Sequence, residues 1–488
     1  MNKTQTVKKN FVMNFILTAA NFIFPIITFP YVSRILLAEG TGRVAFATSI
    51  ASYFSMVAAL GIPTYGIRAC ARIRDDKDKL NKTVQELLII HMSATSLALA
   101  LYFISIFMVP ELYKEKTLML INSLSILLNV FGVNWLYQAL EQYSYITYRS
   151  IFFKIVSIIL MFFFIHQKSD YIIYGGITIF ANAGSNILNF IRLRKLISFK
   201  KVESYDFLVH IRPILVFFAQ SVAITVYTNL DTVMLGFMQS DTEVGYYNAA
   251  IKIKTILLSL VTSLGTVLLP RLSYCIQRND KIQFQNLISK SIRFVFIIAL
   301  PLTIFFILFA KETLIVLSGE DFIGATLSMQ MITPTILLIG LSNITGIQIL
   351  TPLGKEKFVV YSVTFGAILD LIVNYICIPR LGAAGASLGT LIAELSVLAI
   401  QILYTSKQLK EAKSGLHISK IIISCVFATV VVLSISTYIN FSIFCSLIVF
   451  AMIYFGIYVI SLILLKEEFI IVYFFKFLHV FKKTTSHS

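Results

Sequence analysis

Apolar stretches of about 20 residues, each long enough as a helix to cross roughly 30 Å of hydrocarbon, recur from Phe11 almost to the C-terminus. Only 13% of the 488 residues are charged and 57% are hydrophobic, whereas about a quarter of residues are charged in soluble domains. The mean hydropathy is +0.84. These features exclude a water-soluble fold and predict an all-α integral membrane protein.

Fourteen apolar windows are interpreted as membrane-spanning helices, the fifth being the shortest. They cover about 11–33, 44–66, 84–109, 118–140, 151–165, 171–191, 211–238, 245–269, 292–310, 327–350, 358–378, 384–404, 418–438 and 443–465. The short loops leave no room for an ATPase domain, and the sequence contains no GxxxxGK, nucleophile-elbow or HExxH motif. We therefore expect a transporter and not an enzyme.

The basic residues orient these spans. With a cytoplasmic N-terminus, 32 of the 41 Lys and Arg residues fall on the inner side and 7 on the outer side. By the positive-inside rule, this bias predicts that both termini are cytoplasmic. It also explains the net charge of +17 without any binding of nucleic acid. The N-terminal apolar segment has no cleavage site, so we expect an uncleaved first helix. Five scattered cysteines indicate neither a disulfide framework nor a metal site.

A basic connection after the sixth span and a polar loop after the twelfth divide the chain. The predicted parts are a six-helix lobe at 1–203, a second six-helix lobe at 204–410, an additional transmembrane pair at 411–465 and a cytoplasmic tail at 466–488. Because six spans return the chain to its starting side, the lobes are expected to be parallel repeats.

Two weaker patterns accompany this division. Gly42-Arg-Val-Ala-Phe-Ala and Gly245-Tyr-Tyr-Asn-Ala-Ala each open a helix from the outer side, at equivalent places in the two lobes. In the tail, Lys476, His479 and Lys483 fall on one helical face. An interfacial amphipathic helix and a loosely attached tail are both compatible with that spacing.

Several segments together resemble the bacterial polysaccharide transporter family. They are Phe29-Pro-Tyr-Val-Ser-Arg34-Ile-Leu, Tyr227-Thr-Asn-Leu-Asp231-Thr-Val-Met-Leu-Gly236, Val244-Gly-Tyr-Tyr-Asn-Ala-Ala250, Leu269-Pro-Arg-Leu-Ser273, and Leu381-Gly-Ala-Ala-Gly385-Ala-Ser followed by Glu394. The family belongs to the multidrug, oligosaccharidyl-lipid and polysaccharide exporter superfamily. The resemblance covers nearly the whole chain.

The resemblance implies two six-helix bundles around a central cavity, in a bacterial cytoplasmic membrane. It implies a flippase for undecaprenyl-pyrophosphate-linked oligosaccharide repeat units, working by alternating access in O-antigen, capsule or exopolysaccharide biosynthesis. We expect a monomer that needs no cofactor beyond a Na⁺ or H⁺ gradient, with a polymerase and glycosyltransferases as partners. The alternatives are an ion-coupled multidrug exporter, a peptidoglycan-precursor flippase of the same superfamily, and a non-transporting scaffold of glycan assembly.

A cargo that carries pyrophosphate requires cationic groups, because its charge must be compensated in a low-dielectric cavity. The cationic candidates are Arg34, Arg43, Lys252, Arg149 and Lys154. For the first two, snorkelling of the side chain to the outer interface is the alternative. Lys254 is a weaker candidate, since it lies about 200° around the helix from Lys252.

Three carboxylates within spans are candidates for ion coupling or for structural pairing, because an unpaired charge inside a membrane is costly. They are Asp231, Asp370 and Glu394. Asp231 and Lys252 are each expected about 10 Å below the outer surface, where they would pair across two helices. Asp370, with Asn374 one turn later, and Glu394 form a candidate site for Na⁺ or H⁺. Local capping or pairing of the two carboxylates, without any coupling to a gradient, is the alternative.

Two polar faces are predicted to line the cavity. Asn14, Thr18 and Asn21 share one face of the first span, and Asn182, Asn186 and Asn189 share one face of the sixth. Hydrogen bonding between helices is the alternative role for each of these side chains.

Overall fold

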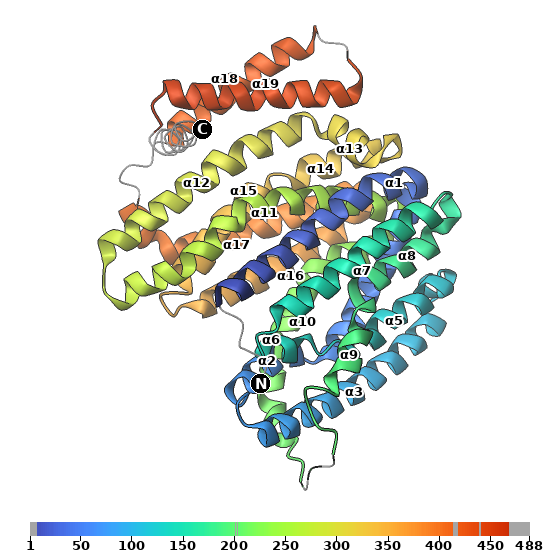
Figure 1. The fold of residues 1–488 in the computed structure, drawn as a ribbon. Coiled ribbons are helices and arrows are strands. Elements are labelled where there is room, and N and C mark those ends of the chain that lie inside the picture. Colours follow the sequence, from blue (N-terminus) through green and yellow to red (C-terminus); the bar gives the residue numbers. More distant parts are fainter. Residues whose placement is uncertain (1–6, 201, 203, 413–417, 439–440, 468–488) are drawn as a thin grey trace, which may run out of the picture. The chain divides into compact units, whose positions relative to one another are not determined.

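The computed structural model describes residues 7–200, 202, 204–412, 418–438 and 441–467, and every regular element in these ranges is a helix (Figure 1). Twelve of these helical segments are long and apolar enough to cross a membrane. The predicted all-α membrane fold is therefore confirmed. The predicted tail helix falls on residues 468–488, outside the described ranges.

The count of twelve and the predicted fourteen differ at two places. The first apolar segment, Val12–Arg72, covers both the first and the second predicted span. The sixth predicted span is a helix interrupted by a π turn, so that each of its pieces is short: α8 (Tyr171–Ile179), η2 (Phe180–Gly184) and α9 (Asn186–Leu193). Fourteen is thus an approximate count.

Contacts divide the chain into two compact units, Met1–Asn248 and Ala249–Ser488. The first unit also contains α1 (Val7–Ala59), α2 (Ile62–Arg72), α3 (Lys77–Met108), α4 (Pro110–Lys114), α5 (Lys116–Gly132), α6 (Asn134–Ala139), α7 (Tyr143–Phe164), η1 (Lys168–Asp170), α10 (Leu208–Met238) and the first turns of α11 (Asp241–Gln277). Within it, α1 packs against α3, α5, α7 and α10.

Helix α1 consists of two helical halves that meet at Leu37, whose backbone has φ 60° and ψ −174°. A leucine rarely adopts a positive φ, so the surrounding packing holds this break in place. The predicted fifth span, 151–165, starts too late, because α7 begins at Tyr143. Tyr, Thr and Arg149 in its first turns lower the local hydropathy, but Arg149 is buried and the backbone is helical.

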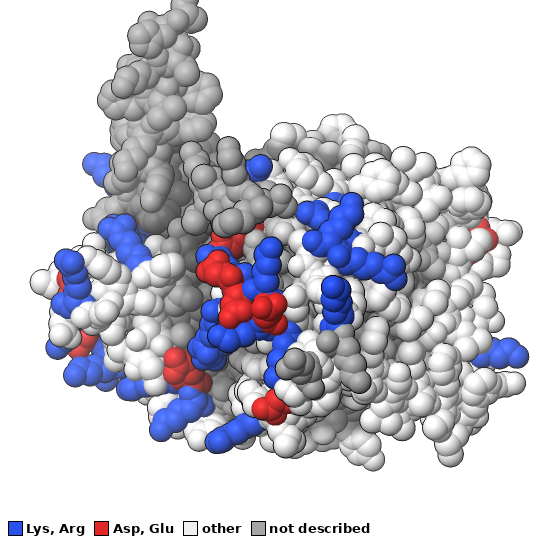
Figure 2. All heavy atoms as spheres, turned by 60° about the horizontal axis from the view of Figure 1, so that its bottom comes forward, with Lys and Arg blue, Asp and Glu red and all other residues white. Residues whose placement is uncertain are grey.

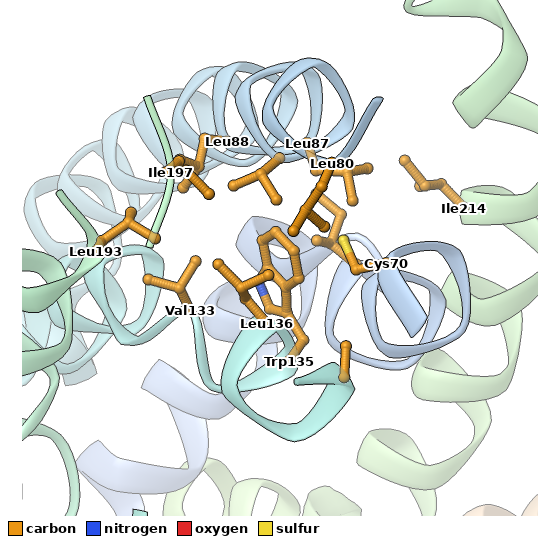
Figure 3. Packing of buried hydrophobic residues seen from close by; sticks show 13 residues of the cluster. Cys70, Leu80, Leu87, Leu88, Val133, Trp135, Leu136, Leu193, Ile197 and Ile214 are labelled. Carbon is orange, nitrogen blue, oxygen red and sulfur yellow. The ribbon is translucent and has the colours of Figure 1, made fainter. Parts of the chain in front are cut away.

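A buried apolar cluster joins α2, α3, α6 and α9 to the start of α10 (Figure 3). Its centre is Trp135, the only tryptophan of the chain, with Cys70 and Leu87 beside it. Gly66 of α2 lies directly against the indole, and a Cβ there would be 2.7 Å from the ring. A glycine at this position therefore allows α2 to approach α6 closely.

The second unit contains the remaining elements in chain order. They are the rest of α11, then α12 (Lys281–Leu308), α13 (Ala310–Ser318), η3 (Glu320–Ala325), α14 (Thr326–Ile332), α15 (Thr335–Asn343), η4 (Ile344–Leu350), α16 (Glu356–Leu381), α17 (Ala383–Ala412), α18 (Ile418–Ser436) and α19 (Ile443–Leu464). Helices α18 and α19 pack on α12 through aromatic residues such as Phe305 and Tyr454. Tyr458 of α19 donates a hydrogen bond to the carbonyl of Ile297, at 2.9 Å.

Many large apolar side chains remain exposed, among them Phe163 and Tyr375 at 71% each. Such exposure is expected where helices face lipid and not water. Lys and Arg side chains instead gather on the face shown in Figure 2, among fewer Asp and Glu. The cytoplasmic orientation that the positive-inside rule assigns to the basic loops stays a prediction.

Candidate functional site

Two cations on α7 are buried in the first unit. Arg149 and Lys154 are each only 7% exposed. In the described part of the chain, neither forms an ion pair. The Lys154 ammonium lies 4.9 Å from the centre of the Phe24 ring on α1, and the Arg149 guanidinium lies 5.7 Å from that of Tyr145. Aromatic faces thus provide part of the compensation that carboxylates usually give.

Arg149 is oriented by amide side chains and keeps unused donors. Its Nη2 donates to Asn134 Oδ1 at 2.9 Å, and Asn189 Nδ2 donates to the same oxygen at 2.9 Å. Its Nε and Nη1 are enclosed and have no hydrogen-bond partner. Arg192 of α9 stacks on the Tyr145 ring at 3.9 Å and donates to Gln142 Oε1 at 3.1 Å. Arg192 was not among the predicted cationic site residues, and it lies in the last turn of α9.

The predicted polar face of the sixth span is split. Asn186 and Asn189 are buried, and Asn186 Nδ2 donates to the carbonyl of Leu128 on α5 at 3.1 Å. Asn182 lies within the π turn and is exposed. The π turn changes the angular spacing, which explains why the three residues do not share one environment.

The polar face of the first span stays together. Asn14, Thr18 and Asn21 are all exposed, and the Thr18 hydroxyl donates to the carbonyl of Asn14 at 2.9 Å. Apolar side chains of the same helix, such as Phe15 and Ile23, are exposed as well, so the lining of a cavity by this stripe stays a prediction.

Arg43, on the second half of α1, is surrounded by carboxylates. Its guanidinium contacts Glu39 at 2.5 Å, Glu115 at 3.1 Å and Asp241 at 3.2 Å. Tyr171 Oη accepts from Arg43 Nη1 at 3.3 Å and donates to Glu115 Oε2 at 2.9 Å. Three carboxylates compensate one cation, so Arg43 serves as the centre of an ion-pair network in this conformation.

A polar cavity of about 430 Å³ adjoins this network. Its wall combines the network carboxylates with Glu111, Lys114, Phe46 and Phe237. Arg34, the other cation of the first span, is exposed and donates to the carbonyl of Pro30 on its own helix at 2.6 Å.

Asp231 of α10 is buried and accepts a hydrogen bond from Tyr247 Oη on α11. Sequence reasoning missed this tyrosine, although the motif around Gly245 contains it. Lys252, the predicted partner of Asp231, lies on the part of α11 that belongs to the second unit. Their pairing stays a prediction.

In the second unit, a carboxylate and an amide of α16 lie against the backbone of α17. Asp370 and Asn374 are 2% and 0% exposed, and both face Gly389 of α17, where a Cβ would lie 2.8 Å from Asp370 Oδ1. Glu394, also on α17, is 6% exposed. Because position 389 is a glycine, the backbone of α17 comes close to the side chains of Asp370 and Asn374.

A hydrogen-bonded chain that sequence reasoning did not single out links α2, α3 and α10. Tyr65 Oη lies 2.8 Å from His210 Nδ1, and His210 Nε2 lies 2.9 Å from Glu86 Oε2. Glu86 and His210 are buried. The signal in the sequence was a carboxylate, Glu86, near the start of the predicted third span.

Comparisons with known proteins bear on the family and on the fold of the chain. The chain is 26% identical over 407 residues to a protein of Escherichia coli (strain K12) named "Putative O-antigen transporter", covering 82% of this chain and 96% of that protein. Its fold is similar to the structure titled "Lipid II flippase MurJ, inward closed conformation", with a TM-score of 0.72, 17% identity, and coverage of 93% of this chain and 100% of that chain. It is also similar to an inward-facing multidrug resistance MATE family transporter, with a TM-score of 0.58, 13% identity, and coverage of 80% and 95%.

Two family models match the chain. The model described as MatE matches residues 217–376, and the model described as polysaccharide biosynthesis protein matches residues 7–276, more than half of the chain. The second match includes α1, α7 and α10, which carry the buried cations, the Arg43 network and Asp231. This multi-pass membrane protein therefore belongs to the polysaccharide biosynthesis protein family.

Proposed function

We propose that the chain is a flippase and not an enzyme, and that it moves undecaprenyl-pyrophosphate-linked oligosaccharide repeat units from the cytoplasmic to the outer leaflet by alternating access. The product would serve O-antigen, capsule or exopolysaccharide synthesis. Its family, the name of its Escherichia coli relative and its flippase-like fold support the proposal.

The observation that carries this proposal is the pair of buried cations on α7. A buried charge without a counter-charge is costly in a membrane protein, so its presence calls for an anionic ligand. Arg149 retains two guanidinium donors without acceptors, and guanidinium groups bind phosphate oxygens in a bidentate manner. These donors are enclosed in this conformation, so we propose that they meet the diphosphate when the helices around α7 part.

Transport is best tested in proteoliposomes that contain purified protein and a fluorescent lipid-linked oligosaccharide. Movement between leaflets is followed by the access of a glycosidase added to one side. We expect protein-dependent movement of the oligosaccharide lipid, faster than that of a lipid II analogue. Efflux of a cationic dye without movement of either lipid would identify a multidrug exporter, and movement of the lipid II analogue alone would identify a peptidoglycan-precursor flippase.

We further propose that a Na⁺ or H⁺ gradient drives the cycle, with Asp370, Asn374 and Glu394 as the coupling site. Buried carboxylates in membrane helices are common in such roles. The same vesicles, with either gradient imposed or collapsed by an ionophore, test this. A transport rate that ignores both gradients would refute the coupling.

We also propose that the protein works as a monomer beside a polymerase and glycosyltransferases of the same pathway. Deletion of the gene should then cause inward-facing lipid-linked oligosaccharide to accumulate. A non-transporting scaffold would instead reduce its synthesis, so the amount and sidedness of the lipid in the deletion strain distinguish the two roles.

A further inference from the structure

The start of α11 crosses α1 at unusually short range. A Cβ on Gly42 of α1 would overlap the carbonyl of Asp241, and a Cβ on Gly245 of α11 would overlap the carbonyl of Ala38. Each glycine thus lies on the backbone of the other helix. These are the two glycines that open equivalent helices in the predicted repeats, so the two related segments pack against each other. Such glycine contacts allow membrane helices to approach closely.

Aromatic side chains extend this crossing. The rings of Phe46 on α1 and Phe237 on α10 meet edge to face, with centroids 5.3 Å apart and planes at 85°. Gly236 lies beneath the Phe46 ring. Val244, within the crossing, is completely buried. The outer ends of α10 and α11 are therefore closed onto α1.

Of the three carboxylates that pair with Arg43, two come from its own side of the crossing and one comes from α11. Glu39 and Glu115 belong, like Arg43, to the part of the chain before residue 203, and Tyr171 of the same part also contacts the guanidinium. Asp241, at the first residue of α11, is the single carboxylate from the other side. If α11 moves away, Arg43 keeps two carboxylates.

We propose that the Arg43–Asp241 ion pair is a latch that holds the outer ends of α10 and α11 against α1, and that it breaks whenever the cavity opens to the outer side. Glu39 and Glu115 retain the guanidinium after Asp241 leaves, so the open state does not contain an uncompensated arginine. The latch rests on the proposed function, because a flippase must expose its cargo to the outer leaflet.

The exposure of the pair suits a latch that opens repeatedly. The side chains of Arg43 and Asp241 are 27% and 35% exposed. A partly hydrated ion pair costs much less to break than a buried one, since water replaces part of the lost interaction. Because Gly42 and Gly245 have no side chains, no side chain at these two positions has to disengage when the helices separate.

A buried reporter cysteine tests the latch. The five native cysteines are replaced by alanine, and Val244→Cys is introduced and labelled in right-side-out vesicles with a membrane-impermeant maleimide. We expect Asp241→Asn to raise the labelling rate about fivefold, the factor that loss of one partly exposed ion pair gives. Glu111→Gln is the matched control, because Glu111 lines the same cavity without contacting Arg43, and we expect no change.

Removal of a carboxylate on the Arg43 side of the crossing should change the labelling rate in the opposite direction. Glu115→Gln removes a carboxylate that stabilises Arg43 in the open state, so labelling of Val244→Cys should fall. A purely structural ion cluster would instead loosen in both variants. Equal rises in Asp241→Asn and Glu115→Gln, or no response to Asp241→Asn, would overturn the latch.

A cross-link provides an independent measurement. In the same background, Phe46→Cys and Phe237→Cys are joined by a short bifunctional methanethiosulfonate, which should stop transport until a reductant is added. Transport that continues after complete cross-linking contradicts the latch. If labelling of Val244→Cys changes as expected but no lipid-linked oligosaccharide moves, the latch is supported and the proposed cargo is wrong.

Discussion

His210 Nε2 lies 2.9 Å from Glu86 Oε2 where the start of α10 meets α3, and both side chains are buried. Glu86 Oε1 also accepts the backbone N–H of Asp206 at 2.7 Å. One carboxylate thus fixes both the beginning of α10 and the chain that leads into it.

Replacing this carboxylate should destabilise the first unit. Glu86→Gln exchanges an acceptor for an amide and weakens two hydrogen bonds in a buried site, so we expect a loss of about 2–4 kcal/mol in the free energy of unfolding. Thermal unfolding in detergent, followed by the emission of Trp135, measures it. Lys79→Ala, which breaks the exposed pair with Asp76, is the control and should leave the transition unchanged. Unfolding of Glu86→Gln at the wild-type temperature would contradict this role.

Because Gly245 contacts the backbone of α1, we expect the stability of the protein to depend strongly on the size of the side chain at this position. Gly245→Ala should cost about 1–3 kcal/mol, because its methyl group overlaps the backbone of α1 and the helices must shift. At Gly456, where a Cβ meets nothing within 4 Å, alanine should instead be neutral or stabilise by about 0.5–1 kcal/mol. Melting temperatures of the two variants make the comparison. Equal effects at the two positions would argue against close contact at Gly245.

The buried cations of α7 should matter for transport through their charge. Arg149→Gln and Lys154→Gln should each lower the transport rate at least about tenfold, since a cation–phosphate contact contributes roughly 1.5–3 kcal/mol. The exposed Arg194 gives the control, Arg194→Gln, which should retain the wild-type rate. Membrane protein level and melting temperature are measured alongside. Wild-type transport rates in both variants would show that Arg149 and Lys154 do not bind the cargo.

Asp170 should contribute stability that depends on pH. Backbone N–H groups of His166 and Gln167 each donate to Asp170 Oδ2 at 2.9 Å, and these bonds hold the pKa of Asp170 below its usual value. A carboxyl group with a lowered pKa stabilises the fold above its unfolded pKa, and this stability is lost as the pH falls through the folded pKa. Near neutral pH, the melting temperature of wild type should therefore be higher than that of Asp170→Asn.

Melting curves at several pH values check this expectation. The gap between wild type and Asp170→Asn should shrink as the pH falls below about 4. The exposed Lys168→Gln provides a control without such a change. A gap that stays constant across the whole pH range would show that ionisation of Asp170 is irrelevant.

The helices of this protein follow from local sequence patterns, whereas the contacts between them do not. Apolar length located nearly every span, yet it placed the start of α7 too late because Arg149 reduces hydropathy without ending the helix. It also assumed regular spacing through Asn182, Asn186 and Asn189, which the π turn interrupts. Arg43 was identified as a cation near the outer side, but its three carboxylates come from α1, a distant loop and α11.

An all-helical membrane protein could be predicted from the amino-acid sequence alone, because burial of apolar residues in lipid and internal pairing of backbone groups are local requirements that each segment must meet. The family resemblance carried by the motifs around Asp231 and Gly245 is likewise a property of the chain alone. The three-dimensional fold was needed to show that Glu86 contacts His210, that the helices cross at Gly42 and Gly245, and that Asp241 pairs with Arg43. Those contacts join residues far apart in the chain, and their partners depend on how whole helices pack, which no local pattern encodes.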